Sequence, residues 1–174
     1  MQLLSRQRGV SLIEVLMAVL IFSLGLIGMA GLLIMATRSN QDAYLRTQVT
    51  FLAQNMADRM RANPIGVWTN AYDANYPTAV AQDCAAGCTP AQLAVHDQQA
   101  WSTQLNTFLP SPSATIACTA ANAGYAPSTA QLSMRPPYGG SCHMTIRWMG
   151  QEMGDVKQNK GGAQLQSFDW EFQP

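Results

Sequence analysis

Arg6-Gln7-Arg8-Gly9-Val10-Ser11-Leu12-Ile13-Glu14-Val15, together with the apolar run that follows it to Ala36, is the stretch around which the rest of this chain is organised. Between Val10 and Ala36 the only charged residue is Glu14. A helix of about 27 residues is long enough to cross a hydrocarbon core of about 30 Å. The run therefore predicts a membrane-spanning helix with a carboxylate just inside its start.

The apolar run is preceded, and not followed, by a small residue, which is unusual for a leader peptide. A secretory leader carries its small residues after the apolar core, so that cleavage removes the core. Here no convincing Ala-x-Ala site follows the run, and Gly9 precedes it. Cleavage between Gly9 and Val10 would leave the apolar segment in the mature protein.

The segment Arg-Gln-Arg-Gly-Val-Ser-Leu-Ile-Glu-Val-Leu-Met-Ala resembles the leader junction and first helix of type IV prepilins. In that family a peptidase cuts after the glycine, the new first residue is N-methylated, and a glutamate is fifth in the mature chain. By position these roles fall on Gly9, Val10 and Glu14, with Val10 standing where Phe or Met is usual. Residues 1–9 would then be the leader peptide, whose basic residues Arg6 and Arg8 favour a cytoplasmic N-terminus.

The charge of Glu14 is unfavourable inside a membrane, and the resemblance indicates a partner for it. An ionised carboxylate inside a bilayer costs several kcal/mol unless it finds a partner. The new amine on Val10 of a neighbouring subunit could be that partner, and the pairing would set the register of each incoming subunit. The alternative is that the carboxylate reaches the nearby interface and has no further role.

A stripe of apolar residues continues the helical pattern beyond the membrane segment. Its members recur every three or four residues and are Leu45, Val49, Leu52, Met56 and Met60. Pro64 ends the pattern, because the residue before a proline is pushed out of helical geometry. We therefore expect one helix of about 80 Å over residues 10–62. Its part in the membrane would be residues 10–36, and its amphipathic continuation, 37–63, would support a globular domain at 64–174.

Two further patterns in this helix bear on its partners. Gly25, Gly28 and Gly31 recur every third residue, which fits either a close-packing face or a set of merely tolerated small residues. The stretch from Asn55 to Pro64, with its Met-Arg-Ala-Asn-Pro ending, resembles the end of the first helix in minor pilins of the PilV, or pilus modification, type.

The fold class that these features predict is α+β and pilin-like: a long N-terminal helix on a small antiparallel sheet, with one additional short helix. Residues 65–87 look irregular, and the aromatic rings of Trp68, Tyr72 and Tyr76 are expected to pin this segment to the core. Thr89-Pro90 starts the additional helix, over residues 90–109. Alternating patterns predict strands at residues 115–118, 130–134, 142–148 and 167–172, with a polar connection over 150–164.

Four cysteines follow the membrane segment: Cys84, Cys88, Cys118 and Cys142. An even number in a domain outside the cytoplasm indicates two disulfides. Of the three connectivities we prefer Cys84–Cys88 with Cys118–Cys142, because the first pair is close in sequence and the second would tie two sheet segments. A zinc site using His96 or His143 is the competing interpretation, which the Cys-x3-Cys spacing and an oxidising compartment disfavour.

Composition narrows the function classes. The formal net charge is zero and 11% of residues are charged, which argues against nucleic-acid binding through a basic patch. The sequence has neither a nucleophile elbow nor a glycine-rich phosphate loop. We therefore expect a substrate of processing enzymes and not an enzyme, with no cofactor and no metal.

Three functions fit these features. The leading hypothesis is a minor pilin of the type IV pilus that helps prime or assemble the filament, and so supports twitching motility and adhesion. The resemblance implies as partners the prepilin peptidase/methyltransferase, other minor pilins, the major pilin and the inner membrane. It also implies a periplasmic globular domain that later joins the pilus. The alternatives are a pseudopilin of a type II secretion system and a periplasmic binding protein held by an uncleaved anchor.

Overall fold

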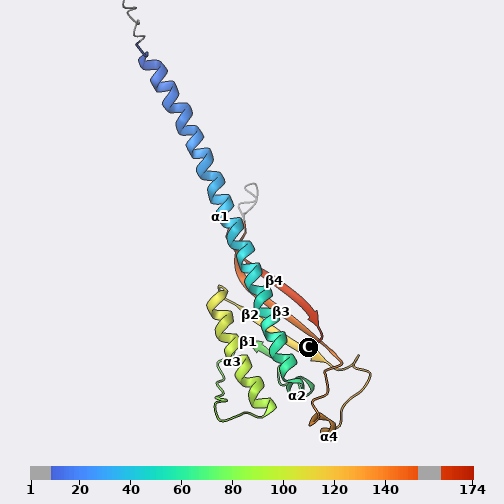
Figure 1. Ribbon diagram of the computed structural model, residues 1–174. Helices are drawn as coiled ribbons and strands as arrows, with labels where there is room; N and C mark the ends of the chain where they lie inside the picture. Colours follow the sequence, from blue (N-terminus) through green and yellow to red (C-terminus); the bar gives the residue numbers. More distant parts are fainter. Residues whose placement is uncertain (1–8, 153–161) are drawn as a thin grey trace, which may run out of the picture. The chain divides into compact units, whose positions relative to one another are not determined.

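The computed structural model describes residues 9–152 and 162–174, in the element order α1 (Leu12–Ala62), α2 (Pro64–Trp68), β1 (Ala74–Tyr76), α3 (Pro90–Phe108), β2 (Ser113–Thr119), α4 (Thr129–Leu132), β3 (Ser141–Glu152) and β4 (Gly162–Phe172) (Figure 1). The chain divides within α1 into two compact units, residues up to Asn40 and residues from Gln41 onwards. Together the elements form a pilin-like α+β fold, as the sequence predicted.

In the second unit, one side of α1 is buried. Val49, Leu52, Met56 and Met60 are fully buried and Leu45 packs against them at the edge of the core, which confirms the predicted stripe. Ala53 and Ala57, which lie between them, are also buried, and their small side chains let the helix backbone lie close to the core. The helix ends at Ala62, directly before the pair Asn63-Pro64, because proline cannot continue it.

The sheet has four antiparallel strands in the order β1-β2-β3-β4. Along β3 the side chains alternate, with Met144, Ile146 and Trp148 buried and His143 and Arg147 exposed. The buried side meets α1 and α3, and α1 crosses in front of the sheet in Figure 1.

The last strand repeats this alternation in the way that the sequence predicted. Phe168, Trp170 and Phe172 face the core, whereas Asp169 and Glu171 are exposed.

α3 is the additional helix that the sequence predicted. Thr89 caps it, accepting a hydrogen bond from the Gln92 amide, and Pro90 occupies its first turn. Trp101 fixes α3 to α1, because its ring is fully buried and its Nε1 donates to the carbonyl oxygen of Leu52 at 2.9 Å. The ring of Tyr76 packs edge-on against Trp101, with the ring centroids 4.9 Å apart.

Three expectations about the second unit were wrong in detail. Residues 130–134 do not form a strand, because Ser128 and Gln131 form a capping box that starts α4. The fourth strand is instead β1, from the segment expected to be irregular, which also contains α2. The polar connection expected at residues 150–164 is shorter, because β3 and β4 pair as far as Glu152 and Gly162. The expected pinning of that irregular segment is confirmed, since Tyr72 and Tyr76 are buried in the core.

Candidate functional site

The start of α1 is where the prepilin-like junction lies. The carbonyl oxygen of Ser11 accepts the first helical hydrogen bonds, from the amides of Glu14 at 3.0 Å and Val15 at 3.3 Å. Gly9 and Val10 therefore precede the helix, and both are exposed. The bond expected to be cleaved lies in non-helical chain next to a helix start, a geometry that a peptidase can enter. Arg6 and Arg8 lie outside the described residues.

Glu14 lies in the first turn of α1. The partial positive charge at a helix N-terminus favours a carboxylate there. The ion pairs within residues 9–152 and 162–174 are formed by Arg59 and Arg61, so no cationic side chain in these ranges pairs with Glu14. Its carboxylate is exposed and open to a cation from elsewhere.

Between Val15 and Ala36 the helix surface of the first unit is almost entirely apolar, with Ser23 as its polar side chain. Every Val, Leu, Ile, Met and Phe side chain from Val10 to Met35 is at least 50% exposed. The helix is long and apolar enough to cross a membrane, and the most apolar window has a mean hydropathy of 2.5 and no buried residue. Nothing lies within 4 Å of where a side chain at Gly25, Gly28 or Gly31 would begin. These glycines therefore have no packing role inside their own unit.

The C-terminal end of α1 is held by a buried polar network. Asp97 of α3 accepts from Arg59 Nη1 at 2.9 Å and from the hydroxyl of Tyr72 at 2.8 Å. Asn63 donates to the same hydroxyl at 3.1 Å and to the carbonyl oxygen of Pro90 at 2.7 Å. Burial, reinforced by the bond to Asp97, raises the pKa of Tyr72 above its ordinary value, so this phenol stays protonated and donates.

This network includes part of the stretch from Asn55 to Pro64. Arg59 and Asn63 come from it, and they tie α1 to α3 and to the start of α2. Sequence reasoning singled out neither Asp97 nor Asn63. The available signal was that Asp97 falls on the same face of its helix as Trp101, where a lone carboxylate needs a partner.

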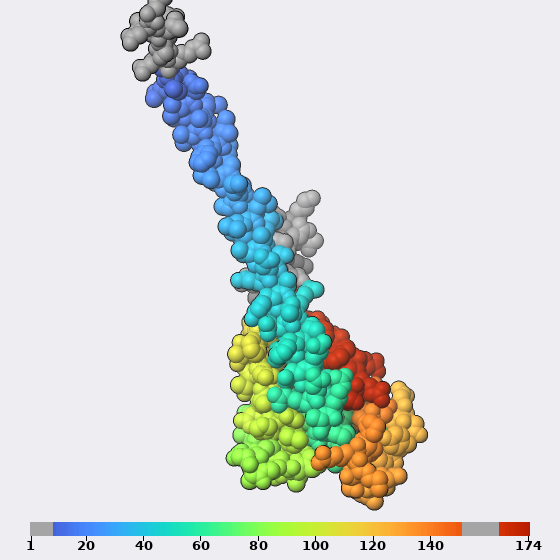
Figure 2. Space-filling model, viewed as in Figure 1, coloured from blue at the N-terminus to red at the C-terminus, as the bar shows by residue number. Residues whose placement is uncertain are grey.

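A groove runs between α1 and the edge strand β4. Figure 2 shows α1 (green-blue) with β4 (red) on one side and α3 (yellow-green) on the other. Two adjoining hollows share Thr50 and Phe168, with volumes of about 290 Å³ and about 190 Å³. Arg46 and Trp148 line the first and Trp170 the second. The groove therefore places the partly exposed rings of Phe168 and Trp170 beside polar residues of α1.

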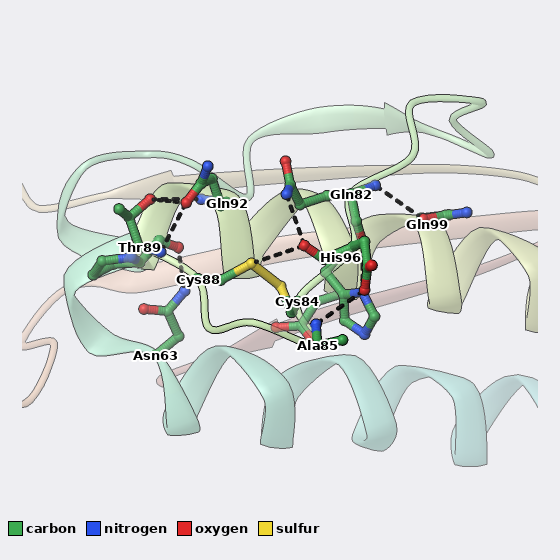
Figure 3. The surroundings of a disulfide bond; sticks show 12 residues. Asn63, Gln82, Cys84, Ala85, Cys88, Thr89, Gln92, His96 and Gln99 are labelled. Atoms are coloured by element: carbon green, nitrogen blue, oxygen red, sulfur yellow. Dashed lines mark hydrogen bonds between the residues drawn. A yellow bond between two sulfur atoms is a disulfide. The ribbon is translucent and has the colours of Figure 1, made fainter.

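The cysteines form two disulfides, Cys84–Cys88 and Cys118–Cys142. The second joins β2 to β3 at directly paired positions and contains the fully buried Cys142. The first lies in a loop just before α3, and both of its cysteines are partly exposed (Figure 3). Bonded in this way, none of the four offers a thiolate to a metal ion.

The two histidines have different surroundings. His96 Nδ1 lies 2.8 Å from the carbonyl oxygen of Gln82, and since a carbonyl only accepts, this nitrogen carries the proton. His143 is exposed on β3, opposite Glu171. Among residues 9–152 and 162–174, no three His, Cys, Asp or Glu side chains are grouped to hold a metal ion.

Comparison with known proteins agrees with the geometry at the start of α1. Residues 4–30 match the prokaryotic N-terminal methylation motif. No curated protein and no solved structure matches the chain. The motif implies a membrane-anchored subunit that prepilin peptidase processes and that assembles with other pilins, and it points to a structural protein and not to an enzyme. It therefore indicates a type IV pilin-like or pseudopilin protein.

Proposed function

We propose that this chain is a minor pilin of the type IV pilus, of the PilV type, that helps prime and assemble the filament. In this proposal residues 1–9 are a leader removed between Gly9 and Val10, and residues 10–36 anchor the subunit in the inner membrane before they join the filament. Residues 37–63 continue the helix and residues 64–174 form the periplasmic domain. Pilus assembly would in turn support twitching motility and adhesion.

The observation that carries this proposal is the exposed apolar surface from Val10 to Met35, which overlaps the methylation motif at residues 4–30. An exposed apolar surface of this size needs lipid or other helices to cover it. The three glycines favour other helices as the cover, because they are open in this chain and small residues let a neighbouring helix approach closely. A helix kept after processing can use lipid first and neighbouring subunits later.

Glu14 has the role of setting subunit register in this proposal. Its exposed carboxylate lacks a cationic partner in the described part of its own chain, and processing would create an amine on Val10 of the next subunit. The Glu14→Ala variant should insert into membranes normally and be processed, but should be depleted from sheared filaments. Glu14→Asp, which keeps the charge, is the matched control and should retain part of the incorporation. Normal incorporation of Glu14→Ala would contradict the register role.

The experiment that tests the pathway is intact-mass and N-terminal peptide analysis of the protein purified from its own membranes. We expect a chain that begins at N-methylated Val10. A chain that still carries residues 1–9 would overturn the filament proposal and favour a binding protein held by an uncleaved anchor.

A pseudopilin of a type II secretion system is the second candidate, because the methylation motif at residues 4–30 fits both classes. The paired cysteines and the Met-Arg-Ala-Asn-Pro sequence at the end of α1 favour the pilus. A deletion strain separates the two. Loss of surface pili with normal secretion supports our proposal, and loss of secretion with intact pili supports the pseudopilin.

A further inference from the structure

Residues 78–88, which we name the strap, run along α3 and are attached to it by side chains three positions apart. The hydroxyl of Ser102 accepts from the Thr78 amide at 2.9 Å. One turn nearer the start of the helix, Gln99 Oε1 accepts from the Gln82 amide at 3.2 Å. His96 Nδ1 then donates to the Gln82 carbonyl oxygen (Figure 3). Hydrogen bonds between side chains of α3 and the backbone of the strap are thus the main attachment of the strap to the helix.

The Cys84–Cys88 disulfide closes the end of the strap where it turns into α3. Gly87 makes this turn with a φ of +96°, and its amide donates to the carbonyl oxygen of Cys84 at 3.0 Å. Cys88 Sγ lies 3.6 Å from the carbonyl oxygen of Asp83. A disulfide sulfur has no proton, so this contact becomes a hydrogen bond only when the bridge is reduced and Cys88 is a thiol. The reduced state therefore has an acceptor ready for it.

The two disulfides differ in access. Cys84 and Cys88 are both partly exposed and lie in a loop. In the second bridge Cys118 is also partly exposed, but Cys142 is fully buried and the bridge joins paired strands in the sheet. Thiol–disulfide exchange requires a thiolate to approach a sulfur, and its rate depends on access. An attacking thiolate can reach the strap without opening the sheet.

We propose that Cys84–Cys88 is a site of thiol–disulfide exchange with dithiol reductants, and that its reduction releases the strap from α3. A thiolate of the dithiol attacks one sulfur, the bond between Cys84 and Cys88 breaks, and the departing sulfur takes a proton. The second thiolate of the reductant then attacks the mixed disulfide and frees the other cysteine. The pair gains two electrons and two protons, and the dithiol becomes a disulfide.

Release of the strap leaves the rest of the unit folded. α3 is fixed to the core by Trp101 and Leu105, both fully buried, and not by the strap. The polar contacts of Ser102, Gln99 and His96 replace hydrogen bonds that the strap can make with water, so each adds only modestly to the attachment of the strap. This inference rests on the soluble unit alone and holds for a pilus or a secretion subunit.

The test uses the full-length protein in detergent micelles, with dithiothreitol as the reductant and no denaturant. Samples are alkylated at intervals and each cysteine is quantified by mass spectrometry, while hydrogen exchange reports on backbone amides. We expect Cys84 and Cys88 to be alkylated roughly tenfold faster than the other pair. The amides of Thr78 and Gln82 should lose protection in step with this alkylation, and the β2–β3 amides should keep theirs.

Two results would overturn the inference. One is simultaneous reduction of both bridges, or earlier reduction of Cys118–Cys142. The other is unchanged protection of the strap after Cys84 and Cys88 have reacted. The double variant Cys84→Ser/Cys88→Ser should show the released strap without reductant, and Gln99→Met, with the bridge closed, should expose the Gln82 amide alone.

Discussion

Replacing Asp97 with alanine removes the shared acceptor of the network that joins α1, α2 and α3. Tyr72 is fully buried, so its hydroxyl would lose its acceptor out of reach of water, at a cost of about 1–3 kcal/mol. Arg59 is 26% exposed, so solvent screens its ion pair and its share is below about 1 kcal/mol. We expect Asp97→Ala to lower the free energy of unfolding by about 3 kcal/mol, or the melting temperature by roughly 10 °C.

Urea unfolding of the full-length protein in detergent, followed by tryptophan fluorescence, measures this loss. Asp97→Asn should lose only about 1 kcal/mol, since its amide oxygen still accepts from Tyr72. Asp58→Ala is the matched control, because Asp58 pairs with Arg61 on the surface and its side chain is 71% exposed, so less than about 0.5 kcal/mol is expected. If Asp97→Ala and Asp58→Ala unfold at the same urea concentration, the network does not stabilise the fold as argued.

Three more predictions follow from other parts of the chain. Gly28→Leu should leave unfolding of the subunit unchanged, since the site is open, but should reduce recovery of the protein in sheared filaments. The hydrogen bond from Thr145 Oγ1 at 2.6 Å holds the pKa of the Asp169 carboxyl below its ordinary value, so Thr145→Val should raise this pKa in an NMR titration. Because the pKa is depressed, the stabilisation is present above the unfolded pKa and is lost as pH falls through the folded one. Gly140→Ala would press its new methyl group on the Thr119 carbonyl oxygen and should cost about 2–3 kcal/mol in urea unfolding.

Each of these has a comparison that separates the proposed cause from a general effect. Gly124→Ala has a positive φ of 71° but no close neighbour, so it should cost only about 1 kcal/mol. Ser167→Ala removes a weaker hydrogen bond to Asp169 and should raise its pKa less than Thr145→Val does. Gly28→Ala, with a smaller side chain, should reduce filament recovery less than Gly28→Leu.

Local patterns predicted the parts of the fold that depend on neighbours in sequence. The spacing from Leu45 to Met60 predicted which side of α1 is buried, and Thr89-Pro90 predicted the start of α3. The strand β1 has no such signal, because three residues become a strand only when residues 114–116 pair with them. For α4 a local signal exists, because the Ser128–Gln131 spacing fits a capping box, and this box outweighs the weak alternation that predicts a strand at residues 130–134.

The candidate site also has one part that a local pattern predicts and other parts that depend on tertiary contacts. The junction at Gly9 and Val10 is a linear motif, so its place at the start of α1 could be predicted. The Asp97 network joins residues up to 38 positions apart, and the groove needs both α1 and β4. Contacts of this kind are made by tertiary packing, which no local pattern encodes.

The connection between β2 and β3 has a consequence for how this molecule can change. The Cys118–Cys142 bridge holds its two ends at paired positions, with the Cα atoms 4.0 Å apart. Doubling the length of a flexible loop between fixed ends costs only about 0.6 kcal/mol. A lineage can therefore lengthen, shorten or replace the exposed tip around residues 120–124 while the strands keep their register. This tip is therefore a place where new binding properties can evolve with little effect on folding, and a suitable site for inserting a foreign epitope.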